Sequence, residues 1–466
     1  MDSSLLKHVA RGSRWVIPLA ALWLGLHGIH RSLWLDEAWV ANSIQAMSLG
    51  DMFWGGEWLQ TSPPLFLLIG RAAVGVFGFS TETLRAVPLA FALVAAVAML
   101  GAARRVAPAW AALAAAALLF PDIAVEYFNS FKQYGAEAAA VSLVLWAIVE
   151  YRRLGFAWYC VIVTALLPLA YPLAFLLPGL VLFVYVNDGV RRAGMIAASS
   201  GAMLGALHFF FIRPNVEASL WTYWRGSFTE AYTPGVWLWV AATVFLSGRA
   251  AMRKNYVALA CLLPCLLLIG AELSGWYPAS PRTRLFVRPG FILAVAMLLE
   301  EFAAWKWIAP VAAVGLAITT VATHRSLPLE DYPAAVSYLR EHVAPNDLLL
   351  VHPDARQGLE LYSAMADWKP PARYGSTGWP CCPRGRTPVR STEVAVRSDL
   401  AALVPNDFQG RVWLFYANRP LHWDYIGLNE GELWRKVLWD RGCPPGEYIA
   451  LPNLVISPMQ CAGIGK

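Results

Sequence analysis

The chain has few charged residues for its length, and this scarcity sets its class. Only 15% of the 466 residues are Asp, Glu, Lys or Arg, whereas 58% are hydrophobic and the mean hydropathy is +0.48. Such a composition excludes an ordinary soluble domain and indicates an integral membrane protein. The net charge of +6 does not indicate a nucleic-acid partner, because the basic residues fall in short loops between apolar runs.

The N-terminal region lacks a cleavage site for a signal peptidase. Lys7, Arg11 and Arg14 precede an apolar run from Trp15 to about Ile29, and no small-residue A-x-A site follows the run. We therefore interpret this run as an uncleaved first span with a cytoplasmic N-terminus.

The Lys and Arg residues between the apolar runs distinguish cytoplasmic loops from outer loops, because cytoplasmic loops are enriched in them. They fall at alternate loops if about eleven helices span, most near the length that a ~30 Å hydrocarbon core requires. This topology puts everything after Ala322 outside the cytoplasm. The expected spans are 15–29, 84–103, 108–123, 136–151, 156–170, 172–187, 194–212, 235–248, 256–273, 286–303 and 307–322.

The run from Pro63 to Phe79 is apolar but is not counted as a span. A span there would put the pairs Arg104-Arg105 and Arg152-Arg153 outside, against the charge rule. Arg71 in its middle also argues against a crossing. We expect a juxtamembrane or re-entrant helix on the outer face.

Residues 323–466 contain no apolar run long enough to span a membrane. We therefore expect a mostly α, polytopic transmembrane domain at 1–322, with an outer loop at 30–83, and an extracytoplasmic domain at 323–466. Alternating patterns in the tail indicate a small α/β domain. They predict helices at 332–340, 356–366 and 433–439, and strands at 347–352 and 411–416.

Cysteine is uncommon, with seven residues, three of them inside expected spans where a thiol is an ordinary apolar group. The other four lie in the tail at Cys381, Cys382, Cys443 and Cys461. An even number fits two disulfides in an oxidising compartment. We expect Cys381 and Cys382 each to pair with one of the other two, since a bridge between neighbours would be strained. A zinc site is the alternative, although the spacing matches no ordinary metal motif.

The most informative stretch is Arg31-Ser-Leu-Trp-Leu-Asp-Glu-Ala-Trp39, just beyond the first expected span. Its adjacent carboxylates, Asp36 and Glu37, lie beside the bilayer, where acids are costly and usually mark chemistry or transport. The structural alternative is that Asp36 caps a helix that starts with Val40 and Ile44 on its apolar face. Glu37 would then be a solvated first-turn acid.

Three motifs, in order, resemble the GT-C superfamily of polytopic glycosyltransferases: Trp34-Leu-Asp-Glu-Ala38, Ser62-Pro-Pro-Leu65, and the stretch from Tyr127 to Tyr134. This superfamily includes protein O-mannosyltransferases and the bacterial enzyme that adds aminoarabinose to lipid A. The resemblance covers residues 10–320. It implies a polyprenyl-phosphate donor carrying one sugar and a catalytic aspartate in the first outer loop. Asp36 is then the catalytic candidate and Glu37 the second acid of the pair.

The same resemblance suggests substrate-binding residues. Lys132, followed by Tyr134, stands where some relatives have an Arg followed by Tyr. Relatives also carry Arg in the outer loop before the tenth span, where this chain has Arg282, Arg284 and Arg288. The family usually has His or Lys near the Pro-Pro pair, whereas this chain has Ser62. Arg213 and Arg225 are weaker candidates.

These residue types suit a phosphate-linked donor. Glycosidases need two carboxylates because an alkoxide leaving group must be protonated, whereas a phosphate leaves as a stabilised anion. One carboxylate then suffices as a base, and cations are needed where the phosphate leaves. The alternatives are a snorkelling Lys132 and an arginine group anchored to lipid head groups. No metal or other cofactor is expected, unless Asp122 and Glu126 join Asp36 at a divalent ion.

The sequence therefore predicts an inverting glycosyltransferase that moves one sugar from a polyprenyl-phosphate donor to an envelope glycan, lipid or protein. A transporter or flippase of lipid-linked sugars is the alternative. It is less favoured because transporters often carry internal repeats and mid-membrane charges, and neither is seen here. A non-catalytic partner subunit in envelope assembly is a third reading. The Ala-rich composition suggests a bacterial inner membrane, with the tail in the periplasm.

Overall fold

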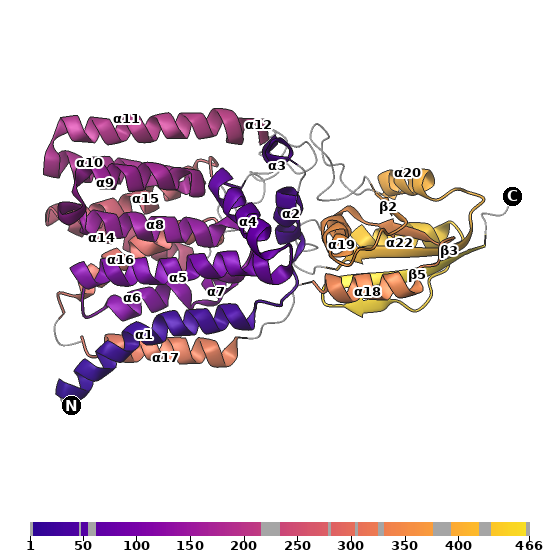
Figure 1. Cartoon of the computed structure of the whole chain (residues 1–466), viewed down its shortest axis with the longest axis horizontal. Helices are drawn as coiled ribbons and strands as arrows, with labels where there is room; N and C mark the ends of the chain where they lie inside the picture. The colour runs from indigo at the N-terminus through magenta and orange to yellow at the C-terminus, as the bar shows by residue number, and fades with distance from the viewer. Residues whose placement is uncertain are drawn as a thin grey trace. The chain divides into compact units, whose positions relative to one another are not determined.

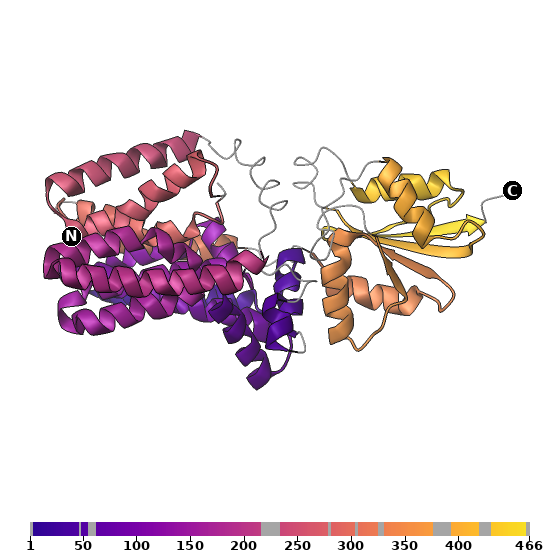
Figure 2. The ribbon, with the colours of Figure 1, turned by 90° about the horizontal axis from the view of Figure 1, so that it is seen from above.

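The chain folds into two compact units, seen in a computed structural model (Figures 1 and 2). The helical unit comprises residues 1–29, 61–77 and 82–326, and the sheet unit comprises residues 30–60, 78–81 and 327–466. The outer-loop residues 30–60 therefore belong to the same unit as the tail. The residues that the structure describes are 3–45, 48–54, 62–215, 234–277, 281–302, 306–324, 330–375, 393–418 and 430–462.

The helical unit consists of helices that lie side by side in Figure 1. The first set is α1 (Ser3–His27), α4 (Pro64–Phe77), α5 (Thr81–Val106), α6 (Ala111–Leu119), α7 (Asp122–Asn129), α8 (Gln133–Val149), α9 (Tyr151–Leu166), α10 (Leu177–Asp188) and α11 (Val190–Leu207). The second set is α12 (Arg213–Asn215), α14 (Pro234–Met252), α15 (Tyr256–Leu273), α16 (Arg288–Leu299) and α17 (Ile308–Thr323). Short segments join some of them: η1 (Leu167–Leu169), η2 (Tyr171–Phe175), η3 (His208–Ile212) and η5 (Leu285–Val287).

These helices are those of an integral membrane protein. Among the described residues, five helices are long and apolar enough to cross a membrane, and α6 with α7, bent by 69°, makes a sixth if counted as one broken span. A helix or bent pair lies at each of the eleven predicted spans. The predicted mostly helical, polytopic fold is confirmed, while the number of crossings and the orientation stay predictions.

Helix α4 coincides with the run that we expect to be juxtamembrane or re-entrant. It is a 14-residue apolar helix that packs against η1. Its Phe66 ring lies 5.4 Å from the Phe131 ring, just before α8. Its relation to a bilayer stays a prediction.

Small residues let α15 pack closely between α10 and α16. A Cβ atom added at Gly290 of α16 would lie 2.5 Å from the Cys261 carbonyl oxygen, and one at Gly179 of α10 would lie 2.9 Å from the Ala260 Cα. Close backbone approach through small residues is the usual way in which membrane helices associate.

Ion pairs lie at the helix ends that carry the basic residues used to predict the topology. The Glu150 carboxylate, between α8 and α9, accepts hydrogen bonds from Arg105 and lies 3.6 Å from the Arg153 guanidinium. Arg192 binds Asp188 at 2.7 Å, between α10 and α11. These charges are therefore compensated locally at the helix ends.

The sheet unit contains a five-stranded sheet of order β2-β1-β3-β5-β4. Strand β1 is parallel to both β2 and β3, whereas β5 is antiparallel to β3 and β4. The strands are β1 (Leu348–Val351), β2 (Ala372–Tyr374), β3 (Gln409–Ala417), β4 (Ile449–Leu451) and β5 (Leu454–Ala462). The helices are α2 (Leu35–Gln45), α3 (Leu49–Trp54), α18 (Tyr332–His342), α19 (Pro353–Met365), α20 (Glu393–Leu403) and α22 (Glu430–Asp440).

Helices cover both faces of this sheet (Figure 2). Successive side chains of a strand point to opposite faces. Leu414 of β3 joins the core made with α20 and α22, where Trp434 is fully buried. Phe415 faces the other way, 6.2 Å from the Tyr332 ring of α18. The predicted small α/β domain is confirmed.

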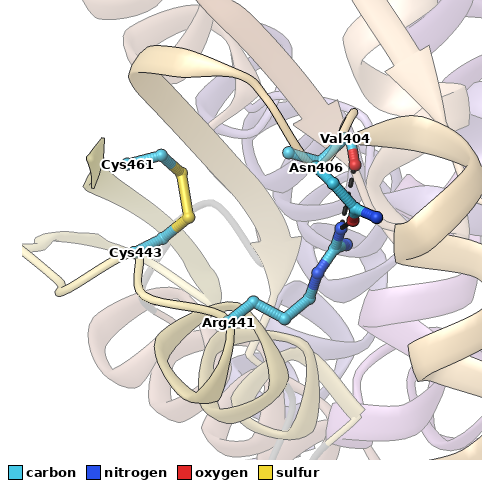
Figure 3. The surroundings of a disulfide bond; sticks show 5 residues. All are labelled: Val404, Asn406, Arg441, Cys443 and Cys461. Atoms are coloured by element: carbon cyan, nitrogen blue, oxygen red, sulfur yellow. Dashed lines mark hydrogen bonds between the residues drawn. A yellow bond between two sulfur atoms is a disulfide. The ribbon is translucent and has the colours of Figure 1, made fainter. Parts of the chain in front are cut away.

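The predicted cysteine pairing is wrong, because Cys443 and Cys461 form a disulfide with each other (Figure 3). The segment that follows Cys443 runs antiparallel to β5, so that Gly446 donates a hydrogen bond to the Pro458 carbonyl at 2.8 Å. This brings the two cysteine Cα atoms to 4.1 Å. Cys381 and Cys382 lie outside the described residues.

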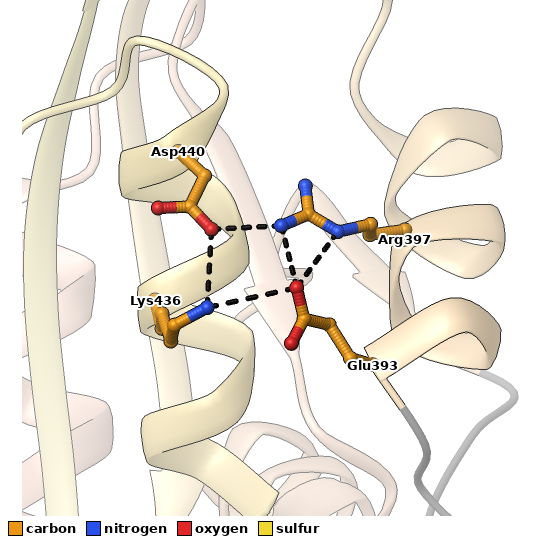
Figure 4. Close-up of polar contacts among 4 residues, drawn as sticks. All are labelled: Glu393, Arg397, Lys436 and Asp440. Carbon is orange, nitrogen blue, oxygen red and sulfur yellow. Dashed lines mark hydrogen bonds and ion pairs between the residues drawn. The ribbon is translucent and has the colours of Figure 1, made fainter.

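Exposed charges join α20 to α22 (Figure 4). Arg397 binds Glu393 at 2.6 Å and Asp440 at 2.8 Å, while Lys436 lies 3.3 Å from Asp440. The hydrogen bond from Arg397 lowers the pKa of Glu393, and that from Lys436 lowers the pKa of Asp440.

Candidate functional site

Asp36 is the second residue of α2 and is partly exposed. The Trp34 carbonyl accepts hydrogen bonds from the backbone N–H groups of Glu37 at 2.9 Å and Ala38 at 2.8 Å. Trp34 therefore stands at the N-cap position, where the carbonyl accepts the first bond of the helix. Asp36 is not the N-cap that the structural alternative required.

Glu37 is the residue that caps this helix. It is fully buried, and its Oε2 accepts a hydrogen bond from the Trp34 backbone N–H at 3.1 Å. A glutamate three positions into a helix that reaches back to the N-cap amide satisfies one of the free donors there. The second acid of the pair thus fixes the start of α2.

A third carboxylate, Glu330, holds the same helix end. Its Oε2 accepts a hydrogen bond from the Leu35 N–H at 2.9 Å, and its carbonyl accepts one from the Ser32 hydroxyl. Glu330 is buried and lies 295 residues from Leu35 in sequence. No local pattern around Glu330 indicates this role, so sequence reasoning missed it.

Helix α2 is further fastened to α19. The Asn42 side-chain amide donates to the Gln357 carbonyl at 3.0 Å and to its Oε1 at 2.9 Å. The Tyr362 hydroxyl accepts a hydrogen bond from the Leu33 N–H at 2.6 Å. The α/β domain therefore carries the segment with the candidate acid.

In the helical unit, the Pro-Pro motif meets the motif around Lys132. The Ser62 hydroxyl donates to Gln133 Oε1 at 3.1 Å. Lys132 is the partly buried N-cap residue of α8, and the Tyr134 ring packs edge-on against Tyr127 at 5.2 Å. The Ser62 hydroxyl thus joins the Pro-Pro motif to the start of α8.

The arginine group lies beside the same helix, because α8 packs against η5 and α16. Arg282 and Arg288 are partly buried, and Arg288 begins α16. Arg284 makes a bidentate pair with Glu272, with N–O distances of 2.9 and 2.8 Å. Because the Glu272 side chain is fully buried, its carboxylate compensates most of the Arg284 charge inside the protein.

The predicted site residues therefore fall into two sets. Asp36 and Glu37 belong to the sheet unit. Lys132, Tyr134 and the three arginines belong to the helical unit, in which α8 packs against η5 and α16. Within the described stretches, no three His, Cys, Asp or Glu side chains are grouped closely enough to hold a metal ion. Arg225 lies outside the described residues, and Arg213 is an exposed residue of α12.

Comparison with solved structures finds proteins that share this architecture. Two crystal structures of ArnT from Cupriavidus metallidurans, a lipid A aminoarabinose transferase, match the chain at 12% identity. The structure bound to undecaprenyl phosphate has a TM-score of 0.51, with 100% of each chain covered. The apo structure has a TM-score of 0.54, with 96% of this chain and 98% of that one covered. No protein-family model and no curated protein sequence matches the chain.

The likeness extends over both units, the membrane helices and the small α/β domain alike. At this level of identity it establishes the fold and not the chemistry. The chain therefore has the fold of these two ArnT structures, a polytopic helical part followed by a small α/β domain.

Proposed function

We propose that this protein transfers one sugar from a polyprenyl-phosphate donor to an extracytoplasmic acceptor, with inversion at the anomeric carbon. One observation carries the proposal. A partly exposed acid, Asp36, stands on a helix start that two buried carboxylates hold in place, in a chain with the ArnT fold from end to end. An ArnT structure holds undecaprenyl phosphate, which is the lipid part of such a donor.

The proposed reaction needs one base. Asp36 accepts the proton of the acceptor hydroxyl, and the hydroxyl oxygen attacks the anomeric carbon from the face opposite the phosphate. The bond from that carbon to the phosphate oxygen breaks, and its electron pair leaves with the polyprenyl phosphate. Because the leaving group is already a stabilised anion, no second carboxylate has to protonate it.

Cations of the helical unit bind the phosphate in this proposal. Lys132, Arg282 and Arg288 are the leading residues, and a fixed donor aimed at developing charge contributes about 3–4 kcal/mol in such sites. Arg284 would have to share its guanidinium between the phosphate and Glu272. Tyr134 lies in the first turn of α8, two residues after Lys132.

Glu37 acts as a positioning residue rather than a second base. Its carboxylate already accepts the Trp34 amide, and its side chain is buried. The proposed cellular place is a bacterial inner membrane with the α/β domain in the periplasm, where the acceptor is an envelope glycan, lipid or protein.

The test is radiolabel transfer from a panel of undecaprenyl-phosphate sugars into envelope fractions, using purified protein. Asp36→Asn removes the base and is expected to lower turnover by at least about 10²-fold. Asp51→Asn is the matched control, since Asp51 is an exposed acid of α3 in the same outer segment. Equal turnover of Asp36→Asn and wild type would exclude Asp36 as the base. Movement of labelled lipid across vesicles without transfer would favour the flippase alternative.

A further inference from the structure

Arg85 is a buried cation that the sequence did not single out. It is the fifth residue of α5 and is 3% exposed. Its guanidinium nitrogen Nη1 donates a hydrogen bond to the Asn129 carbonyl, 44 residues further along the chain. A buried charge is costly unless polar groups of the protein bind it, so a buried arginine indicates a contact on which the local structure depends.

The carbonyl that Arg85 binds lies at the C-terminal end of α7. Asn129 is the last residue of that helix, and the last four carbonyls of a helix have no partner within it. The same end carries the negative pole of the helix dipole, which a cation stabilises. Arg85 therefore caps α7 from a different helix and fixes the point where the chain leaves α7.

The segment that begins at this point is extended and leads directly to Lys132. Ser130 and Lys132 both have extended backbone angles, and α8 starts at Gln133. The Lys132 N–H donates to the Ser130 carbonyl at 2.7 Å, and the Ser130 hydroxyl donates to the Glu126 carbonyl of α7 at 2.8 Å. Residues 129–133 thus form a defined structure, which we call the Lys132 turn.

Contacts from outside α7 and α8 hold the Lys132 turn. Arg85 of α5 binds its first residue, and the hydroxyl of Ser62, just before α4, binds its last. Between them, the Phe131 side chain is fully buried, and its ring lies 5.4 Å from the Phe66 ring of α4. The turn is therefore fixed at both ends and in its middle, while Lys132 itself is only partly buried.

We propose that Arg85 is a positioning residue of the phosphate site, which holds the Lys132 turn so that the lysine ammonium is presented to the phosphate of the lipid-linked donor. The inference rests on the proposed function and adds to it a residue that touches no substrate. A lysine side chain is a flexible point charge, so its phosphate contact depends on where its backbone is fixed. Fixing the backbone before the ligand binds lowers the entropy cost of binding. Because Arg85 is enclosed, it acts on the phosphate through Lys132.

Binding of undecaprenyl phosphate to purified full-length protein tests the inference through a double-mutant cycle. Arg85→Met removes the hydrogen bond to Asn129 and is expected to weaken binding by about tenfold. Lys132→Met removes the ammonium and is expected to weaken binding by at least about tenfold. Because Arg85 acts through Lys132, the double variant should bind about as weakly as Lys132→Met alone. Two factors that multiply in the double variant would overturn the inference.

Kinetics separate this role from a general loss of folding. In Arg85→Met the KM for the donor is expected to rise more than kcat falls, because the lost contact acts on binding. A fall in kcat at unchanged KM is what partly folded protein would give, and it would contradict the inference. Arg105→Met is the control, since Arg105 lies in the last turn of the same helix and pairs with Glu150. It is expected to leave binding unchanged.

Two milder variants keep the test decisive if Arg85→Met does not fold. Arg85→Lys keeps the charge with fewer donors, and Ser62→Ala frees the other end of the Lys132 turn. Each is expected to weaken binding of undecaprenyl phosphate by about threefold, and each effect should vanish in the Lys132→Met background. Effects that persist in that background, or no effect of either variant, would overturn the inference.

The outcomes separate the inference from the proposed function. If wild type does not bind undecaprenyl phosphate, the proposed function fails, and the inference fails with it. If Lys132→Met binds as well as wild type, the inference is wrong, and the arginines of the helical unit remain as the phosphate ligands of the proposed reaction. If Lys132→Met binds weakly and the effect of Arg85→Met multiplies with it, the inference is wrong and the proposed function stands.

Discussion

The buried carboxylates of the two units are satisfied in different ways. In the sheet unit, Glu37, Glu330 and Asp354 each accept a backbone N–H, from Trp34, Leu35 and Ala417 respectively. In the helical unit, Glu272 binds a guanidinium, and no hydrogen bond or ion pair from the described residues reaches Glu137. An acid that binds a backbone donor fixes the chain at that point, whereas an ion pair such as Arg284–Glu272 joins two side chains.

The largest expected effect concerns the ion pair of the helical unit. Arg284→Ala removes the guanidinium that binds the buried Glu272 carboxylate, which should lower the free energy of unfolding by about 3–5 kcal/mol. Thermal unfolding of purified protein in detergent measures this change. The double variant Glu272→Leu with Arg284→Met should recover most of the stability. Recovery of stability without recovery of undecaprenyl phosphate binding would show that Arg284 also contacts the phosphate.

The disulfide is the corresponding test in the sheet unit. Replacing both Cys443 and Cys461 by Ser opens a loop of 18 residues and should lower the free energy of unfolding by about 3 kcal/mol. Wild type should lose similar stability in dithiothreitol, whereas the double variant should not respond to it. Cys160→Ala, in a membrane helix, is the control. A wild-type melting temperature that ignores the reductant would contradict the expectation.

Glu330 should behave as a positioning residue. Glu330→Ala leaves the Leu35 N–H buried without an acceptor, which should cost about 1–3 kcal/mol and loosen the start of α2. Hydrogen exchange of residues 35–45 should become faster, and kcat should fall while binding of undecaprenyl phosphate is kept. Glu330→Gln retains an acceptor oxygen and should restore most activity. Unchanged exchange in Glu330→Ala would argue against this role.

The smallest effect belongs to the exposed charges between α20 and α22. The pKa values of Glu393 and Asp440 are lower in the folded protein than in the unfolded chain, so their pairs stabilise the fold at neutral pH. This contribution is complete above the ordinary carboxyl pKa of about 4 and is lost as the pH falls through the lowered values. The small difference in melting temperature between wild type and Arg397→Ala should therefore be equal at pH 7 and 5.5 and shrink toward pH 3. A difference that grows on acidification would contradict it.

Much of the fold could be predicted because it follows from local patterns. Hydropathy and loop charges located the membrane helices, and alternation in the tail located α18, β1, α19, β3 and α22. Strand β5 was missed because Pro458 interrupts its apolar run, and proline usually excludes a central strand. The cysteine pairing was missed because it depends on how residues 443–446 lie along β5, which no spacing reveals.

The candidate site could be predicted less well. The motifs around Asp36, Ser62 and Lys132 identified segments, and the structure joins the last two through Gln133. The sequence did not reveal that Glu330 holds α2, because that contact joins residues 295 apart. It also did not reveal that Glu37 binds the Trp34 amide, because the expected N-cap was Asp36 rather than Trp34.

The attachment of α2 to α19 has a consequence for the whole molecule. A chain cut after α17 would keep every predicted membrane span but would lose Glu330, Gln357 and Tyr362, the residues that hold the segment around position 36. Such a truncated protein would insert into a bilayer and could still take up a lipid phosphate, yet it would have no fixed acid to receive the acceptor proton. The α/β domain is thus required to position Asp36 in the proposed transferase, and variation in it should alter the rate of transfer.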